Sequence, residues 1–291
     1  MSNYSTIVTV RATRRTIDTS SLFDASYTNS NASPVDQFLE NCIALNKQWS
    51  SLQPSEDVVP ELGRLILVGY VSAVEGYMRS LIRKLIHIDP YTRDNCASFQ
   101  LSFAAALHHE RDMLPDALLE ETSFSTQKVI GTSLGKFVGV KSLSPGTNKL
   151  LDEFDQILHL RHCCTHRFGM LGAKNATALG LSVHGRLLEK PVKLSKTALE
   201  DIADLTFSMV KSINNDVFKT VLDRAATVKH PDGPGIGLGW KWNKSRDRKA
   251  FKRYYDIFCS TRDASPSPTA DDLYELFRTQ YKKVGTTQAR A

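Results

Sequence analysis

The apolar positions of this chain recur mainly at the spacing of α-helices. The pattern is strongest over about 60–88, where two apolar stripes leave only a narrow polar face. A helix that is apolar on nearly all sides lies at the centre of a bundle. Further helices are predicted from Pro34 to about Ser50, after the start signal Ser144-Pro145, and after the capping box Thr197 to Glu200. The sequence therefore predicts an all-α fold, a helical bundle with long antiparallel helices.

The remaining segments divide the chain into an arm, a helical domain and an extension. Residues 1–33 are rich in Ser, Thr and Asn and predict an N-terminal arm, either without regular structure or with one or two short strands. The helical domain is expected over 34–230, with an insertion of short helices and loops at about 90–143. Within this domain, the alternation from Ala178 to Val192 predicts a small β-hairpin. Residues 231–291 hold a Gly/Pro loop followed by a basic, aromatic C-terminal helical extension.

Two charged residues stand on the apolar stripes of the long helices. Glu75 lies inside a stripe of the helix at 60–88, and Arg161 continues the stripe of the helix that begins at Pro145. A charge in such a place is costly unless it is paired. We therefore expect the two helices to face each other, with Glu75 and Arg161 in a bidentate ion pair. The pair is either purely structural or serves to orient Arg161.

The heptapeptide Arg161-His162-Cys163-Cys164-Thr165-His166-Arg167 places an arginine five positions before a histidine, near the end of this helix. On an unbroken helix five residues turn by about 500°, so the two side chains would point about 140° apart. If Arg161 and His166 act together, the helix must end or distort near Thr165. Gly169 supplies a stop, because glycine readily adopts the left-handed conformation of a C-cap.

These segments resemble the HEPN-domain ribonucleases. The apolar run from Leu65 to Met78 is similar to the family's long helix with its internal glutamate, and the heptapeptide resembles the family's R-x4-6-H motif. The resemblance covers about 34–230 loosely. It implies that Arg161 and His166 are catalytic and that Glu75 and His162 support them. Histidine at position 162 departs from the Asn or Asp that many members have there.

The resemblance also implies an activity and a setting. HEPN ribonucleases cleave RNA, often tRNA, without a metal or another cofactor, at a site formed between two copies of the chain. They are commonly toxins of toxin–antitoxin pairs or enzymes of prokaryotic antiphage defence. For this chain we expect a homodimer with RNA as its substrate. An antitoxin or another defence-system protein is expected as a further partner.

Arginine and histidine are residue types that suit this chemistry. When the 2′-hydroxyl attacks the adjacent phosphate, a base takes its proton, an acid protonates the leaving 5′-oxygen, and a cation stabilises the phosphorane. Histidine titrates near neutral pH and serves both proton transfers, whereas arginine binds phosphate oxygens as a planar cation. One Arg161 and one His166 are too few for three roles. Two chains related by a two-fold axis supply two of each.

The charge of the chain mildly favours a nucleic-acid partner. A net charge of +6 over 291 residues attracts polyanions, although a basic protein without such a partner has the same composition. The candidate RNA-binding residues are Arg79 and Arg83 of the long helix, Arg167 of the motif, and Lys244, Arg246, Arg248 and Lys249 of the extension. The aromatic residues at 240–258 either stack on unpaired bases or pack onto the bundle.

Composition also bears on the compartment. The chain has five cysteines without a regular framework, which indicates reduced thiols and a cytoplasmic protein. The N-terminus lacks the apolar region of a signal peptide, and no apolar run reaches the length of a membrane span. We therefore expect no membrane partner.

Three other interpretations of the sequence compete with this one. His159, Cys163 and His166 share a helical face at a spacing that can bind zinc, but the usual CxxC and HExxH patterns are missing, so no metal site is expected. Arg224 and His230 also match R-x4-6-H, a match that we interpret as coincidence. Finally, a HEPN-like bundle can be a non-catalytic module that binds RNA or protein.

Overall fold

The computed structural model describes residues 15–28, 30–53, 56–108, 110, 113–120, 122–226 and 240–288, with backbone alone beyond Tyr281. The chain divides into two units, Met1–Asn31 and Ala32–Ala291. The described part of the first unit holds one short 3-10 helix, η1 (Thr19–Leu22), without a buried residue. The second unit is helical, and the described residues form no β-strand. The prediction of an all-α fold is confirmed.

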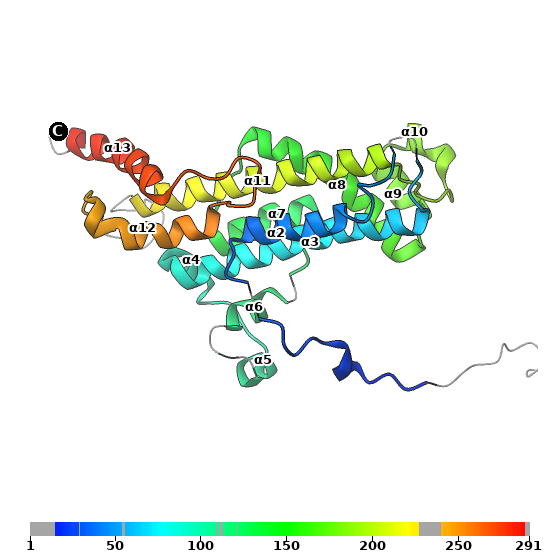
Figure 1. The fold of residues 1–291 in the computed structure, drawn as a ribbon, viewed down its shortest axis with the longest axis horizontal. Coiled ribbons are helices and arrows are strands. Elements are labelled where there is room, and N and C mark those ends of the chain that lie inside the picture. The colour runs from blue at the N-terminus through cyan, green and yellow to red at the C-terminus, as the bar shows by residue number, and fades with distance from the viewer. Residues whose placement is uncertain are drawn as a thin grey trace, which may run out of the picture. The chain divides into compact units, whose positions relative to one another are not determined.

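The second unit contains long helices and several short ones (Figure 1). In chain order they are α2 (Pro34–Asn46), α3 (Pro60–Ile88), α4 (Pro90–Cys96), α5 (Phe103–His108), α6 (Leu114–Leu119), α7 (Gln127–Ser133), the π-helical turn η3 (Leu134–Val138), α8 (Pro145–Arg167), α9 (Ala173–Ala178), α10 (Leu181–His184), the 3-10 turn η4 (Gly185–Leu187), α11 (Lys196–Ala226), α12 (Lys244–Phe258) and α13 (Ala270–Gln288).

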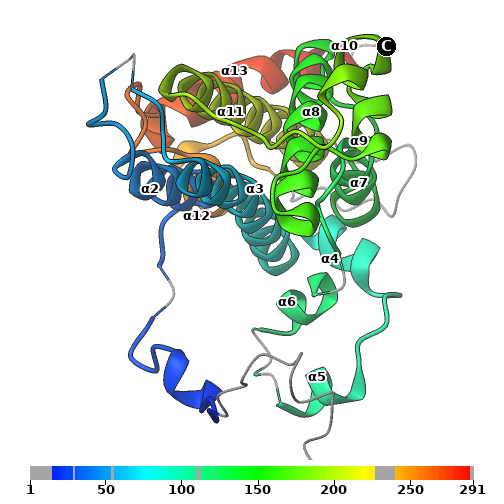
Figure 2. The same ribbon diagram turned by 90° about the vertical axis from the view of Figure 1, so that its right-hand side faces the viewer.

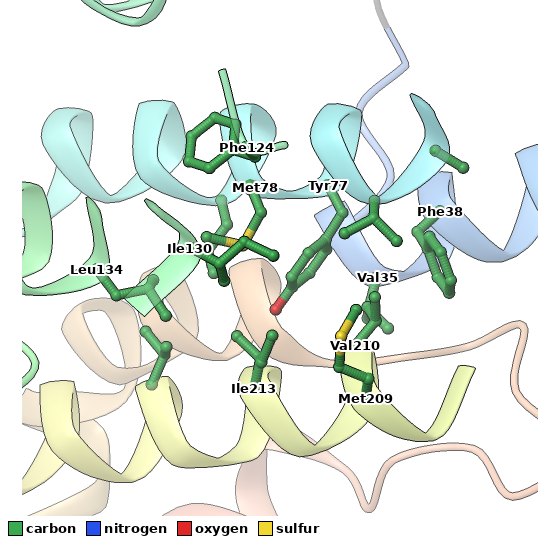
Figure 3. Close-up of a cluster of buried hydrophobic side chains, with 14 of the residues drawn as sticks. Val35, Phe38, Tyr77, Met78, Phe124, Ile130, Leu134, Met209, Val210 and Ile213 are labelled. Atoms are coloured by element: carbon green, nitrogen blue, oxygen red, sulfur yellow. The ribbon is translucent and has the colours of Figure 1, made fainter. Parts of the chain in front are cut away.

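The core of this unit lies between α2, α3, α8 and α11. α3 packs against the other three helices, and Figure 3 shows its Tyr77 and Met78 opposite Met209 and Ile213 of α11, all of them buried. The end of α8 meets the start of α3, where Arg64 donates a hydrogen bond to the carbonyl of Phe168. α8 therefore runs antiparallel to α3. Figure 2 looks along the bundle from this end, with α9 and α10 beside α8.

Prolines and hydroxyl caps set most helix starts. Pro34, Pro60 and Pro145 each stand in a first helical turn, and the Ser144 hydroxyl accepts the N–H of Thr147. The predicted cap of α11 needs a correction. α11 is already helical at Lys196, so the cap is Ser195, whose hydroxyl accepts the N–H of Ala198 at 3.1 Å. The Thr197 to Glu200 pattern lies inside the first turn instead of before it.

The predicted β-hairpin at about 178–192 is wrong. Gly180, with φ of +102°, turns the chain, and its carbonyl accepts the N–H of His184 to close the helical turn α10. The sheet-like hydrogen bonds join 169–171 to 189–192 instead, with one isolated bridge between Met170 and Pro191. The alternation in the sequence thus belongs to a surface segment, whose Leu181 and Val183 stay exposed.

The segment at 90–143, set apart as an insertion, contributes to the core in its second half. Phe124 and Ile130 are fully buried, and Figure 3 shows both beside Met78. Because both residues belong to the buried core, the bundle needs this part of the segment for its packing.

The apolar character of α3 follows from its place in the bundle. Among the described helices it is long and apolar enough to cross a membrane, yet 61% of its most apolar window is buried inside the fold. Burial on several sides by α2, α8 and α11 accounts for its composition.

Candidate functional site

The motif helix continues past the point where a break was expected. α8 stays helical through Arg167 and ends at Phe168, which adopts the left-handed conformation with φ of 51° and ψ of 37°. The condition for joint action of Arg161 and His166 within one chain, an end or distortion of the helix near Thr165, is therefore not met. Since the helix is unbroken, the side chains of Arg161 and His166 leave it about 140° apart. One chain does not bring these two residues together.

Gly169 lies one residue after the left-handed C-cap, which Phe168 occupies in place of the expected glycine. Its φ is +92°, and a Cβ at this position would lie 2.6 Å from the Arg64 side chain. Arg64 donates to the Phe168 carbonyl at 2.5 Å, and its guanidinium lies 5.2 Å from the centre of the Phe168 ring. The close approach of α3 fixes the direction in which the chain leaves the motif.

Glu75 and Arg161 face each other across α3 and α8, as their positions on the apolar stripes predict. Arg161 Nη2 lies 4.0 Å from Glu75 Oε1, with the side chains 17% and 28% exposed. This distance is that of a loose ion pair, not of the predicted bidentate contact. Among the described residues, Nε of Arg161 is buried and has no hydrogen-bond partner. The guanidinium thus keeps one donor that the described part of the chain does not use.

The histidine that lies beside His166 is His162. Their rings are 4.6 Å apart between centres and tilted by 49°. His166 is exposed, whereas His162 is partly buried. Burial lowers the pKa of His162, and the nearby cationic groups, beginning with His166, lower it further. Two imidazoles therefore share one end of α8, of which one is open to solvent and the other resists protonation.

Asn175 of α9 is the residue of this region that sequence patterns did not reveal. It is 3% exposed and hydrogen-bonds to two histidines and a cysteine of α8. The amide lies 3.2 Å from His159 Nδ1, 3.1 Å from His162 Nδ1 and 3.2 Å from Cys163 Sγ. A six-residue helix shows too little periodicity to mark one of its residues as buried. A buried amide needs such partners, because leaving it unpaired costs free energy.

The zinc interpretation requires a group of His, Cys, Asp or Glu side chains close enough to bind one metal ion. The described part of the chain contains no set of three such side chains. His159 and Cys163 contact Asn175 instead.

Three of the candidate RNA-binding arginines are engaged within the protein. Arg79 donates to the carbonyls of Leu119 and Thr122, the latter at 2.7 Å. Arg83 pairs with Asp116 at 3.3 Å. Arg167 contacts both carboxylate oxygens of Glu189, at 2.8 and 2.9 Å. Arg79 and Arg83 therefore hold the α6 segment on α3, and Arg167 holds the segment after α10.

The basic helix α12 presents its cations outward and its aromatic residues inward. Lys244, Arg246, Arg248 and Lys249 are exposed, and Lys244 and Arg248 share Asp271 at 3.2 Å each. The tryptophans before the helix pack into an aromatic cluster of the extension; its members are Trp240, Trp242, Phe251, Tyr274, Phe277 and Tyr281. These aromatic residues join the core cluster that includes the bundle, and Trp240 donates to the carbonyl of Ala225 in α11, as one of the two interpretations predicted. The cations lie on the outside of the helix.

Arg224, the arginine of the second R-x4-6-H match, has a structural role. Arg224 is buried and pairs with Asp89 at 2.5 Å, and it also donates to the carbonyl of Val138. Asp89 in turn accepts from the hydroxyl of Tyr254 at 3.1 Å. This network ties α11 and α12 to the end of α3. His230 lies outside the described residues.

An apolar surface lies next to the motif. Phe168 is 77% exposed and Leu65 is 68% exposed, and together with Val68 and Cys164 they line a shallow pocket at the junction of α3 and α8. Figure 1 places α9 and α10, whose Leu181 is also exposed, at this same end of the bundle.

Comparison with known proteins gave no match: no family model, no curated protein and no solved structure is significantly similar to this chain.

Proposed function

We propose that this chain is a metal-independent endoribonuclease of the HEPN type, which acts as a homodimer. The observation that carries the proposal is the end of α8, where the exposed His166 and the partly buried His162 beside it lie on the same helix as Arg161, whose Nε has no hydrogen-bond partner among the described residues. Histidine supplies proton transfer and arginine supplies phosphate binding, which are the two requirements of RNA cleavage by the 2′-hydroxyl.

The reaction needs no group from outside the protein. One His166 takes the proton of the 2′-hydroxyl, whose oxygen then bonds to the adjacent phosphorus. The bond from phosphorus to the 5′-oxygen breaks, and the protonated His166 of the second chain gives that oxygen a proton. Arg161 stabilises the charge of the phosphorane. The products carry a 2′,3′-cyclic phosphate and a 5′-hydroxyl.

A dimer is part of the proposal for a geometric reason. Arg161 and His166 of one chain diverge by about 140° on the unbroken helix, so a second copy is needed to place an arginine and two histidines around one phosphate. The exposed Phe168 and Leu65 beside the motif are an apolar surface of the kind that buries in such an interface. The proposed dimer contact therefore lies at the α8 end of the bundle.

RNA binding outside the centre is assigned to the exposed cations of α12, of which Arg246 and Lys249 have no ion pair among the described residues. Such cations bind the phosphate backbone without base specificity. The expected setting is the cytoplasm of a prokaryotic cell, in antiphage defence or a toxin–antitoxin system. tRNA and an inhibitory partner protein are the first candidates for substrate and regulator.

The test is cleavage of total RNA by purified protein in excess EDTA, with mapping of the product ends. We expect wild type to leave cyclic phosphates, and His166→Ala to reduce the rate by about 100-fold or more, as for loss of a general acid–base. Arg161→Ala should reduce it similarly. His108→Ala is the matched control, because His108 is an exposed helical histidine in α5, far along the chain from the motif.

A fully active His166→Ala protein would contradict the proposal. The second candidate function, a non-catalytic RNA-binding module, is supported by the outward cations of α12. It predicts RNA binding that is unchanged in His166→Ala and weakened when Arg246 and Lys249 are replaced by glutamate, with no cleavage by any variant.

A further inference from the structure

Asn175 gives two histidines of α8 opposite hydrogen-bonding roles, because it accepts from the Nδ1 atom of one ring and donates to that of the other. Its Oδ1 lies 3.2 Å from Nδ1 of His159, and its Nδ2 lies 3.1 Å from Nδ1 of His162. An amide side chain accepts at one end and donates at the other. One of the two Nδ1 atoms must therefore carry a proton while the other carries none. The two imidazoles cannot both be protonated at Nδ1 as long as Asn175 bridges them.

A third contact of Asn175 indicates which ring carries the proton. Its Nδ2 also donates to Sγ of Cys163 at 3.2 Å, so the amide nitrogen lies on the side of Cys163 and His162 and the amide oxygen faces His159. The Asn175 amide group then points its N–H toward His162. In that arrangement Nδ1 of His162 accepts, and its single proton resides on Nε2.

The surroundings of His162 act in the same direction. The charged and titratable groups that face it are His159, Arg161 and His166 on α8 and Lys174 on α9, none of which is an acid. Partial burial lowers the pKa of His162 first, and the positive charge of these groups lowers it further. A second proton on His162 is therefore opposed by desolvation, by charge and by the Asn175 hydrogen bond.

We propose that Asn175 is a positioning residue that holds His162 as the neutral tautomer with its proton on Nε2. The consequence for catalysis rests on the proposed ribonuclease function: His162 donates a hydrogen bond to a phosphate oxygen, and His166 is the proton-transfer group of each chain. The tautomer itself does not depend on that function. It is a property of the free protein and is measured without RNA.

The experiment is nitrogen-15 NMR of histidine-labelled protein, in which the two ring nitrogens report the tautomer and its titration. His162→Gln assigns the signals. In wild type we expect Nδ1 of His162 to be unprotonated at neutral pH and Nε2 to be protonated. Asn175→Asp replaces the donor by a carboxylate, which accepts only. In that variant Nδ1 should carry a proton, and the pKa of His162 should rise by about one to three pH units.

Asn148→Asp is the control, because it adds the same charge to an exposed position at the start of α8. It should leave the His162 signals unchanged. A wild-type His162 with its proton on Nδ1 would overturn the proposal, and so would a folded Asn175→Asp protein with an unaltered His162 titration. If Asn175→Asp does not fold, the wild-type tautomer alone still decides.

The pH dependence of cleavage separates this inference from the proposed function. If both hold, the activity profile of Asn175→Asp shifts relative to wild type, while that of Asn148→Asp does not. If His162 is the Nε2–H tautomer but wild type cleaves no RNA, the ribonuclease proposal fails and the positioning role of Asn175 stands.

Discussion

Arg161 shows what a charged residue on an apolar stripe can reveal. Its position predicted a partner on the facing helix, and Glu75 is there, at 4.0 Å. The length of the contact, and the lack of a partner for Nε among the described residues, were not predictable, because they depend on how closely α3 and α8 pack. Burial thus holds Arg161 on α8, and Glu75 adds a loose contact that orients its guanidinium.

Because the ion pair between Glu75 and Arg161 is loose, a structural role of Glu75 and a functional role predict different effects of its replacement. A partly exposed pair at the limit of contact contributes about 1 kcal/mol or less. We expect Glu75→Gln to lower the free energy of unfolding by no more than that, measured in urea, while RNA cleavage falls because Arg161 loses its orientation. A loss of about 3 kcal/mol or more, the cost of breaking a buried pair, would identify the pair as purely structural.

His162 links pH to stability with a defined sign. Its pKa in the folded chain is lowered from the ordinary 6.5, first by burial. The unfolded chain therefore takes up this proton at a higher pH than the folded chain, and stability rises with pH across that interval. We expect the free energy of unfolding to fall as the pH drops from about 7.5 to about 5.5.

Replacement of His162 by Gln should remove part of that slope. His108→Gln, at an exposed histidine, should leave the slope as it is. An equal slope in wild type and His162→Gln would contradict the lowered pKa of His162.

At the scale of helices, the sequence was informative where elements are long. The starts of α2, α3 and α8 follow from their prolines and caps. The sequence pattern did not predict α9 and α10. Both helices are short, and the alternation of their residues matched the pattern of a hairpin. The sequence pattern also missed Asn175, since hydrogen bonds between α8 and α9 arise only once the chain has folded. Periodicity reports which face is buried, not which polar groups meet there.

Arg79 makes the role of the α6 segment testable. Its two hydrogen bonds to the Leu119 and Thr122 carbonyls involve a charged donor, and such bonds contribute about 1.5–3 kcal/mol each. We expect Arg79→Met to increase hydrogen exchange over 113–124 without changing RNA affinity. Arg83→Met, which removes a contact of 3.3 Å to a side chain, should have a smaller effect.

The opposite result for Arg79→Met has a clear meaning as well. Weaker RNA binding with unchanged exchange at 113–124 would assign Arg79 to the RNA surface, as its sequence position first suggested.

At the scale of the molecule, the end of α8 combines features that a monomer does not explain. Phe168 is 77% exposed although it occupies the left-handed position, which a non-glycine residue adopts at a cost. Arg64 holds its backbone carbonyl, and the guanidinium of Arg64 also lies 5.2 Å from the centre of its ring. Leu65 stands exposed beside it. A second copy that covers this surface would also bring the two histidine pairs together.

This arrangement predicts that Phe168→Glu separates the dimer and abolishes cleavage together. Burial of one large apolar side chain contributes about 1.5–3 kcal/mol, and a two-fold interface contains it twice, so the dissociation constant should rise by about 100-fold or more. The mass by analytical ultracentrifugation and the cleavage rate should fall at the same protein concentrations.

Phe103→Glu is the matched control, because Phe103 is 81% exposed on α5 and distant in sequence from the motif. Since both phenylalanines are exposed, neither variant should lower the unfolding midpoint of the monomer appreciably. A Phe168→Glu protein that stays dimeric and active would place the interface elsewhere, and a wild type that is monomeric while cleaving RNA would remove the need for a second chain.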